Sequence, residues 1–491
     1  MHAQSYIGID LGSSSIKAVA LNDAGQCIAT ASRAQPIDTG PGGKAEQSPA
    51  TWRQLAGECL TQLTSDLAHK SFQPAAIAAT GQMNAPVLLD ANLESLGPVQ
   101  MWCDSRCGPQ CEILTTRLTA EHLLEITGHT AVTGYTAPKL LWIADHEPDK
   151  LDQVAHVVFP KDFITKTLTG NIVTDYSDAS NSLLLDVRNA QWDPHIAKAV
   201  GLQHLQLPLL ANSKDIVGQV SADAASWSGL PLGLPVAAGA GDSIAVALGA
   251  GLSGPDQIQI VIGTAGNVNC VLDNIAIDHA GRVHTGFFVD NEHWICSGVQ
   301  QSSGTSLRWW SKITGRPPQK LLDEAGTANR VHNVVFAPYL AGERTPHLDP
   351  HVRGVFAGLD QHSSRSDMTR AILEGVAFSF KDAVEVFARM GIEPARTVIC
   401  GGGADSDLWC QIIASVLGLS LQRTTGDATA RGAAMLAACA AGRFESWQDA
   451  ATDWYSGADR FAPLTQDVQR YRQGYQQFEK LYPAVSKILS C

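Results

Sequence analysis

Residues 6–21 read YIGIDLGSSSIKAVAL, which is an apolar run, a turn rich in glycine and serine, and a second apolar run. This order predicts two antiparallel strands joined by a tight turn at residues 10–15. A third strand is expected at residues 27–31, because a turn signal at residues 22–25 precedes it. Together the three segments predict a β-meander that opens a mixed sheet.

The second half of the chain repeats this strand–turn–strand pattern. Strands are expected at residues 257–262 and 268–272, on either side of a tight turn at residues 263–266. Helical patterns alternate with the strands in each half, which predicts an α/β fold. The two copies lie about half a chain apart, and 491 residues are too many for one core. We therefore expect two domains of related design, residues 1–250 and residues 251–491.

The composition is that of an acidic globular protein. Its net charge of -13 and its isoelectric point near 5.6 argue against nucleic acid or an anionic membrane as the main partner. The most apolar stretch, residues 234–252, carries Asp242 and suits a buried strand and helix better than a membrane span. No signal peptide is expected, and 11 scattered cysteines without a CxxC pair are typical of reduced thiols in a cytoplasmic protein.

Cys103, Cys107 and Cys111 form the one cluster of cysteines, at a spacing of four that would place them on one face of a helix. A metal site is one interpretation of this spacing. Residues 108–109, Gly-Pro, interrupt the run, and no fourth ligand follows nearby. Unrelated thiols are therefore the favoured interpretation.

Two glycine-rich turns are candidates for binding phosphate. The turn at residues 10–15 offers backbone N–H groups and hydroxyls to an anion, and Asp10 is placed to hold a metal ion beside it. The turn at residues 263–266 offers similar donors. An ordinary polar hairpin is the alternative for each turn. Two such turns that face each other across a cleft suit a nucleotide bound between two domains.

Two further segments can carry chemistry. Residues 401–404, Gly-Gly-Gly-Ala, connect an expected strand to a helix that starts near Asp407, so a ligand can approach the backbone there. A tight strand–helix connection explains the same pattern. Asp242 is the only charged residue in the apolar stretch around it, and in a cleft it can accept a proton from a substrate hydroxyl. A helix N-cap is the alternative interpretation of Asp242.

At these residues the chain resembles the FGGY family of carbohydrate kinases, and within it the xylulokinases. Residues 134–142, GYTAPKLLW, resemble the N-terminal signature of the family. Residues 354–359, GVFAGL, together with residues 367–375, resemble its C-terminal signature, and residues 338–346 match the xylulokinases further. The likeness is colinear from Tyr6 to about Gly442.

The resemblance implies two actin-like (ribonuclease H-like) domains with a deep cleft, and the ATP-dependent phosphorylation of a ketose, with D-xylulose as the leading substrate. It implies that Asp242 is the general base and that Asp10 and Asp242 hold Mg²⁺. The sugar contacts that it implies are Gln82, Met83, Asn84, Asp104, Asp242 and Ser243. The ATP contacts that it implies are Gly12, Ser13, Ser14, Lys17, Gly263, Thr264, Gly266, Gly402, Gly403 and Ser406.

Some of these roles have structural alternatives. Met83 and Trp102 are equally explained as core residues, and Asp104 as the partner of Arg106 on a loop. Two positions also depart from the xylulokinase pattern, which usually has His in place of Asn84 and Asn in place of Ser243. Both departures lie on the sugar side, so we expect the reaction and leave the sugar open.

The substrates left open are D-xylulose, L-xylulose, D-ribulose, another ketose and a polyol. An actin-like ATPase without a small substrate is an alternative function that the two hairpin turns also allow. A catalytically silent sugar sensor is a further alternative, which the retention of Asp10, Asp242 and both turns disfavours. Members of the family are often dimers, so a homodimer is a further expectation. Sugar and ATP are the expected small-molecule partners, and neither nucleic acid nor a membrane is expected.

Overall fold

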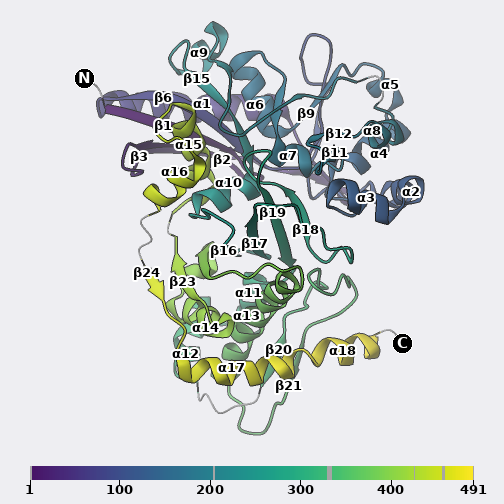
Figure 1. Cartoon of the computed structure of the whole chain (residues 1–491), viewed down its shortest axis with the longest axis vertical. Coiled ribbons are helices and arrows are strands. Elements are labelled where there is room, and N and C mark those ends of the chain that lie inside the picture. Colours follow the sequence, from purple (N-terminus) through teal and green to yellow (C-terminus); the bar gives the residue numbers. More distant parts are fainter. Residues whose placement is uncertain (1–2, 203–204, 329–333, 425, 456–458, 490–491) are drawn as a thin grey trace.

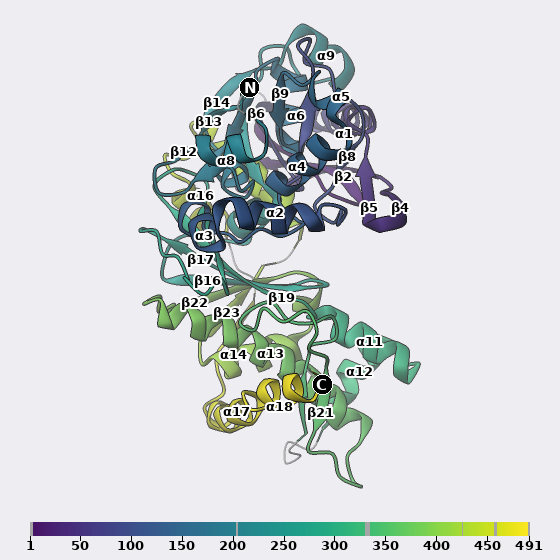
Figure 2. The same ribbon diagram turned by 90° about the vertical axis from the view of Figure 1, so that its right-hand side faces the viewer.

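The computed structural model describes residues 3–202, 205–328, 334–424, 426–455 and 459–489, so the predicted free thiol of Cys491 lies outside the described residues. Figures 1 and 2 show two lobes stacked along the long axis of the molecule. The first half of the chain builds one lobe, and most of the second half builds the other. Strands and helices alternate in both, which confirms the predicted α/β class.

A six-stranded sheet forms the centre of the first domain. Its order is β14-β15-β6-β1-β2-β3, with β1 antiparallel to β2 and parallel to β6, and β6 parallel to β15. The predicted meander is therefore present at one side of this sheet. The strands are β1 (Ala3–Leu11), β2 (Ser15–Asn22), β3 (Cys27–Ala34), β6 (Phe72–Gly81), β14 (Ile216–Gln219) and β15 (Pro235–Gly241).

Register decides which chain segments meet at the edge of this sheet. Leu11 at the end of β1 pairs with Gly81 at the end of β6, and Gly81 pairs with Gly241 at the end of β15. Because parallel strands end at the same edge, the three segments that follow these residues leave the sheet side by side. Three stretches that are far apart in sequence are thereby brought to one place.

A seven-stranded sheet of the same design forms the centre of the second domain. Its order is β18-β19-β17-β16-β22-β23-β24, with β16 antiparallel to β17 and parallel to β22. The predicted repeat of strand, glycine-rich turn and strand is thus confirmed. The strands are β16 (Gln257–Ile262), β17 (Gly266–Leu272), β18 (His284–Phe287), β19 (Trp294–Gln300), β22 (Arg396–Cys400), β23 (Ser420–Arg423) and β24 (Asp459–Phe461).

Short strands make smaller ladders outside the two main sheets. They are β4 (Asp38–Gly40), β5 (Lys44–Gln47) and β8 (Val99–Gln100); β7 (Val87–Leu89) and β9 (His156–Val158); β10 (Val173–Asp175) and β13 (Leu209–Ala211); β11 (Leu185–Asp186) and β12 (Gln191–Trp192); β20 (Val335–Ala337) and β21 (Val355–Ala357). The connection between β20 and β21 contributes to the cavity described below.

Apolar side chains on alternate positions of β1 cover the two faces of the first sheet. Ile7 and Ile9 belong to a core that includes Trp52 and Leu60 of α1 (Pro49–His69). Tyr6 belongs to a second core on the opposite face. This alternation is what a strand with both faces buried requires. Helices α6 (Pro160–Thr169) and α9 (Ala222–Ser228) extend the layer that contains α1.

Two helices from the second half of the chain pack on the first sheet. Helix α15 (Ala428–Ala440) lies against β1, β6 and β15, and α16 (Trp447–Trp454) packs beside it, as Figure 1 also shows. A Cβ atom on Gly8 would lie 2.1 Å from the carbonyl oxygen of Ala430, so this contact needs glycine. Helices α15 and α16 thus pack with the first domain although they follow residue 250 in sequence, and the division at residue 250 stays a prediction.

Helices α2 (Gly108–Leu118), α3 (Ala120–Thr127) and α4 (Thr136–His146) pack around a smaller core beside the first sheet. Cys107 is the residue before α2, and Cys103 lies before the helix, so the three clustered cysteines do not share a helical face. Among the described residues, no three His, Cys, Asp or Glu side chains are grouped to hold a metal ion. The short helices of this region are α5 (Pro148–Leu151), α7 (Tyr176–Ser180) and α8 (Pro194–Ala199).

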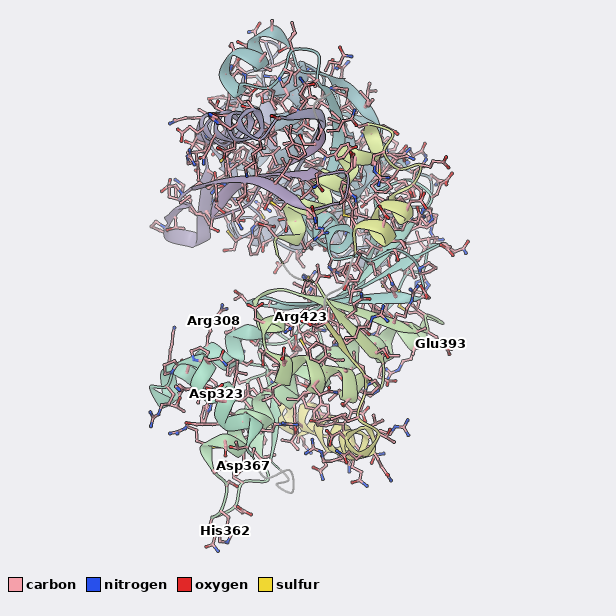
Figure 3. The ribbon with its side chains drawn as sticks, turned by 90° about the vertical axis from the view of Figure 1, so that its left-hand side faces the viewer. Arg308, Asp323, His362, Asp367, Glu393 and Arg423 are labelled. Carbon is pink, nitrogen blue, oxygen red and sulfur yellow. The ribbon has the colours of Figure 1, made fainter. Side chains whose placement is uncertain are left out.

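Helices cover the second sheet in the same way. They are α11 (Gly304–Thr314), α12 (Pro318–Gly326), α13 (Arg365–Arg389), α14 (Asp407–Leu417), α17 (Thr465–Phe478) and α18 (Leu481–Leu489). Figure 3 shows Arg308 and Arg423 on the side of the second domain that faces the first, and His362 at its far end.

Within the described ranges, no helix has the length and apolar character needed to cross a membrane.

Candidate active site

Asp10, near the end of β1, is buried at the carboxyl edge of the first sheet. Its Oδ1 atom has no hydrogen-bond partner among the described residues. Burial raises the pKa of Asp10 well above its ordinary value, and the charges of Asp242 and Asp427 raise it further, against the opposing effect of Lys17. Carboxylates thus face one another at this edge, which is an electrostatic setting that a divalent cation relieves.

The carbonyl oxygens of the turn after β1 accept hydrogen bonds from the protein. The side chain of Gln35 donates to the carbonyl of Gly12, and the side chain of Gln47 donates to the carbonyl of Ser13 at 2.7 Å. The N–H of Gln35 donates to the carbonyl of Ser14 at 2.9 Å. Because protein donors hold these carbonyls, the turn fits the predicted phosphate site, where backbone N–H groups would bind an anion.

Lys17 lies on β2 close to this turn, and its ammonium forms an ion pair with Asp427 at 2.9 Å. The hydrogen bond that Lys17 donates to Asp427 raises the pKa of Lys17, so its charge is retained. Asp427 also caps the start of α15. The pair therefore ties the phosphate turn of the first half to a helix of the second half.

The second glycine-rich turn follows β16 and is supported by the start of α11. The N–H of Gly304 donates to the carbonyl of Gly263 at 2.9 Å, and the N–H of Thr305 donates to the carbonyl of Thr264 at 3.2 Å. A Cβ atom on Gly266 would lie 2.5 Å from the ring of Phe380. Thr264 itself is exposed at the tip of the turn.

The third glycine-rich loop follows β22 and lies next to the second turn. A Cβ atom on Gly403 would come within 2.2 Å of the side chain of Ile262, the residue directly before Gly263. Gly402 is exposed and has open space beside it. The hydroxyl of Ser406 accepts from the N–H of Trp409 and caps α14. The two predicted ATP-binding segments of the second domain are thus neighbours.

A cavity of about 300 Å³ lies where the two domains meet. Its walls combine the ends of β6 and β15, the segment between α3 and α4, the strands β17 to β19, and the connection from β20 to β21. The residues that line it are Met83, Asn84, Trp102, His129, Val132, Gly134, Tyr135, Asn181, Asp242, Ser243, Ile244, Asn267, Asn269, His284, Gly286, Ile295, Ser297, Val299 and Arg344.

Asp242 is the first residue of α10 (Asp242–Gly249), and Gly241 rather than Asp242 is the N-cap. The alternative role of Asp242 as a cap is therefore not observed. Burial raises the pKa of its carboxyl to about 6. The N–H of Gly241 donates to the hydroxyl of Ser177 at 3.0 Å, which fixes the backbone from which Asp242 projects.

Three of the predicted sugar contacts lie beside Asp242 in the cavity wall. Met83 is buried, and its sulfur accepts a hydrogen bond from the hydroxyl of Ser243 at 3.0 Å. Asn84 adopts a φ of 69°, and its Oδ1 atom is buried without a partner in the described chain. A buried amide oxygen without a partner is costly, so Asn84 is positioned for a ligand hydroxyl.

Gln82 and Asp104, two of the predicted sugar contacts, are not among the residues that line the cavity. The side chain of Gln82 is buried and donates to Gln47 at 2.8 Å. The carboxylate of Asp104 accepts from Arg106 at 2.7 Å and from the N–H of Ala45 at 2.9 Å. The carboxylate of Asp104 is thus held by protein partners, whereas the Oε1 atom of Gln82, like Oδ1 of Asn84, is buried without a partner in the described chain.

Several wall residues were absent from the predicted set. Asn267 and Asn269 project from β17, His284 comes from β18, and Arg344 comes from the β20–β21 connection. Trp102 is 50% exposed and lines the cavity, so its alternative role as a core residue is not observed. Arg344 lies within residues 338–346, which resemble the xylulokinases. This likeness is the sequence feature that could have identified Arg344 as a site residue.

The chain matches two family models, the N-terminal domain of the FGGY family of carbohydrate kinases over residues 5–249 and the C-terminal domain of that family over residues 259–441. The xylulose kinase of Lactococcus lactis subsp. lactis (strain IL1403) is 35% identical over 491 residues, which cover 98% of this chain and 97% of that protein. The xylulose kinase of Bacillus subtilis (strain 168) is 34% identical, with coverage of 97% and 96%. The crystal structure of xylulose kinase from Rhodospirillum rubrum matches with a TM-score of 0.93 and 28% identity, over 99% of this chain and 100% of that one.

Proposed function

We propose that this chain, which belongs to the FGGY family of carbohydrate kinases, uses ATP to phosphorylate D-xylulose to D-xylulose 5-phosphate. Relatives named xylulose kinase, at 35% and 34% identity over nearly the whole chain, support this sugar. Within the molecule, the observation that carries the proposal is the carboxylate of Asp242, which has a raised pKa and lies on a cavity shared by both domains.

Asp242 is the proposed general base. It takes the proton from the sugar hydroxyl that attacks the terminal phosphoryl group of ATP. A carboxyl with a pKa of about 6 is still ionised at neutral pH, and it is a stronger base than an exposed aspartate. A base of this kind contributes ~10²–10⁴-fold to the rate. Closure of the two domains would exclude water, which otherwise competes with the sugar for the phosphoryl group.

The three glycine-rich loops are the proposed ATP site. The turns after β1 and β16 would bind the phosphates from opposite domains through backbone N–H groups. The loop after β22 would bind the adenosine, since Gly402 has open space beside it. The proposed contacts are Gly12, Ser13, Ser14, Lys17, Gly263, Thr264, Gly266, Gly402, Gly403 and Ser406.

Mg²⁺ is the proposed metal ion, and Asp10 and Asp242 would hold it. The unpaired Oδ1 atom of Asp10 and its raised pKa fit a site that gains a cation. Two carboxylates suit Mg²⁺, because this ion completes its shell with phosphate oxygens and water. When bound, the ion neutralises charge on the transferred phosphoryl group.

A coupled assay of ADP release tests the reaction and the sugar together. The purified chain is given ATP and Mg²⁺ with D-xylulose, L-xylulose, D-ribulose, hexuloses or polyols. The expected result is the highest kcat/KM with D-xylulose and no ADP without a sugar. ATP hydrolysis that is independent of every sugar would contradict the kinase and favour an actin-like ATPase. A higher kcat/KM with another sugar would keep the reaction and replace the substrate. The homodimer and the cytoplasmic location stay predictions.

A further inference from the structure

Polar side chains from both domains form one part of the cavity wall. These residues are distant in sequence from Asp242. This Arg344 cluster consists of Arg344, His129, His284 and Tyr135. The rings of His129 and Tyr135 are stacked with centroids 5.0 Å apart. The rings of His129 and His284 meet edge to face at 5.4 Å. Contact between the two domains thus builds the cluster.

The backbone holds the cluster together across the domain boundary. The N–H of Thr285 donates to the carbonyl of Gly128 at 3.2 Å, which joins the segment before His129 to the strand that carries His284. A Cβ atom on Gly128 would lie 1.9 Å from the carbonyl oxygen of Thr285, so this approach is closed to other residues. The positions of the two imidazoles are therefore set by a tight backbone contact.

Three nitrogen atoms of the cluster are buried without a hydrogen-bond partner in the described chain. They are Nη2 of Arg344, Nδ1 of His129 and Nε2 of His284. Buried polar atoms normally have partners, because leaving one unpaired costs free energy. Three such atoms around one cavity indicate a polar ligand with several oxygen atoms. A cation is disfavoured there by the charge of Arg344.

The cluster carries one fixed positive charge and no acid. Burial lowers the pKa of His129 to about 3 and that of His284 well below its ordinary value, with a smaller contribution from Arg344, so both imidazoles are neutral. Asp242 is the only acid among the residues that line the cavity. The nearest acid in sequence, Glu343, accepts instead from the backbone N–H groups of Gln301 and Arg344, at 2.9 and 2.8 Å.

We propose that Arg344 is a specificity-determining residue, which donates a hydrogen bond to the ketone oxygen of the ketose while His129 and His284 bond the neighbouring hydroxyls. This inference rests on the proposed function. A guanidinium only donates, and a ketone oxygen only accepts. A hydroxyl in the same place also needs an acceptor for its own proton. Its tetrahedral carbon places the oxygen outside the plane that a trigonal carbonyl carbon defines. Arg344 therefore favours a ketose over the polyol with the same carbon chain.

The test compares D-xylulose with xylitol, which differs from it only by reduction of the ketone. With Arg344→Gln, kcat/KM for D-xylulose is expected to fall about 10- to 100-fold, because a hydrogen bond from a charged group is lost. The value for xylitol is expected to change by less than about threefold, since the polyol makes little use of that bond. The exposed Arg353, which donates to the backbone carbonyls of Pro350 and Val352, provides the matched control Arg353→Gln.

Each of the following outcomes bears on the proposed role of Arg344 or on the proposed function. An equal loss with both substrates, at an unchanged unfolding temperature, would overturn the proposal, because Arg344 would then not distinguish the ketone from the hydroxyl. D-Xylonate as a better wild-type substrate than D-xylulose, with the advantage lost in Arg344→Gln, would make the cluster a carboxylate site and also overturn it. If Arg344→Gln unfolds, the comparison is made with Arg344→Lys, which keeps the charge but not the planar fork. Failure of the wild type with every ketose would refute the proposed function itself and is measured first.

Discussion

The indole N–H of Trp102 donates a hydrogen bond to the hydroxyl of Ser13 at 2.9 Å. Trp102 lines the cavity between the domains, whereas Ser13 belongs to the turn after β1. One side-chain contact therefore joins the proposed sugar site to the proposed phosphate site. A sugar that packs against the indole would also restrain the turn that receives ATP.

The Trp102–Ser13 contact predicts that the two sites communicate. Trp102→Phe keeps most of the apolar ring and removes the N–H donor, and Ser13→Ala removes the acceptor. Each change is expected to raise the KM for ATP by roughly 2- to 10-fold, the factor that corresponds to the loss of one hydrogen bond. Steady-state kinetics of the two variants and of the double variant check this. Effects that add fully in the double variant would show that the contact is not used.

Asp242→Asn is expected to lower kcat by ~10²–10⁴-fold, because the amide cannot accept the proton of the attacking hydroxyl. Sugar affinity, measured by isothermal titration calorimetry, is expected to change far less, since the shape of the side chain is kept. Asp223→Asn is the control, because this exposed residue forms an ion pair with Arg53 at the surface. A kcat within tenfold of the wild type would reject Asp242 as the base.

Asp10→Asn is expected to stabilise the metal-free protein and to abolish its response to Mg²⁺. The wild type buries a carboxylate that is repelled by Asp242 and Asp427, so removal of its charge relieves unfavourable free energy. We expect the unfolding temperature in EDTA to rise by about 1–3 °C. Addition of Mg²⁺ is expected to raise this temperature in the wild type only. Asp152→Asn, at an exposed position, is the control; equal shifts with Mg²⁺ in wild type and Asp10→Asn would exclude Asp10 as a ligand.

The raised pKa of Asp382 predicts that the stability of the fold depends on pH, independently of catalysis. This residue of α13 is buried, and burial raises the pKa of its carboxyl to about 7, although the hydroxyl of Tyr475 donates to it at 2.7 Å. The unfolded chain releases the same proton near pH 4. The folded state thus binds more protons between about pH 4 and 7, so the contribution of Asp382 to stability is full below that window and is lost as the pH rises through it.

Replacement of Asp382 by Asn removes this loss, because the amide stays neutral and still accepts from Tyr475. The unfolding temperature of the variant minus that of the wild type is expected to increase steadily from pH 4.5 to pH 8, since only the wild type must bury a charge at high pH. Thermal unfolding across this range measures it. The exposed Glu393 provides the control Glu393→Gln. A difference that stays constant with pH would show that Asp382 does not keep its proton in the fold.

Local sequence patterns were sufficient for the strands, turns and helix starts that carry most of the predicted ATP site. The turn at residues 10–15 and the turn at residues 263–266 are defined by glycine and serine between apolar runs, and both appear in the fold as predicted. Asp242 was identifiable because one carboxylate stands in an apolar stretch. Such features depend on neighbours in sequence, so they can be read from the sequence.

Other features depend on partners that are far away along the chain. Asp104 has the right chemistry for a sugar, but Arg106 and the N–H of Ala45 occupy its carboxylate, and the amide nitrogen of Gln82 is already bonded to Gln47. Helix α15 packs on the first sheet because Gly8 permits close contact with it, and no local pattern reveals which sheet a helix will cover.

Arg344 and His284 reach the cavity only because the two domains meet beside His129. Their polar atoms lose water when that contact forms, which makes them candidates for a ligand. Residue type and spacing thus determined where phosphate and a base are expected. Long-range packing decided which polar groups are already paired and which remain available to the sugar, because pairing is a property of atoms brought together in space.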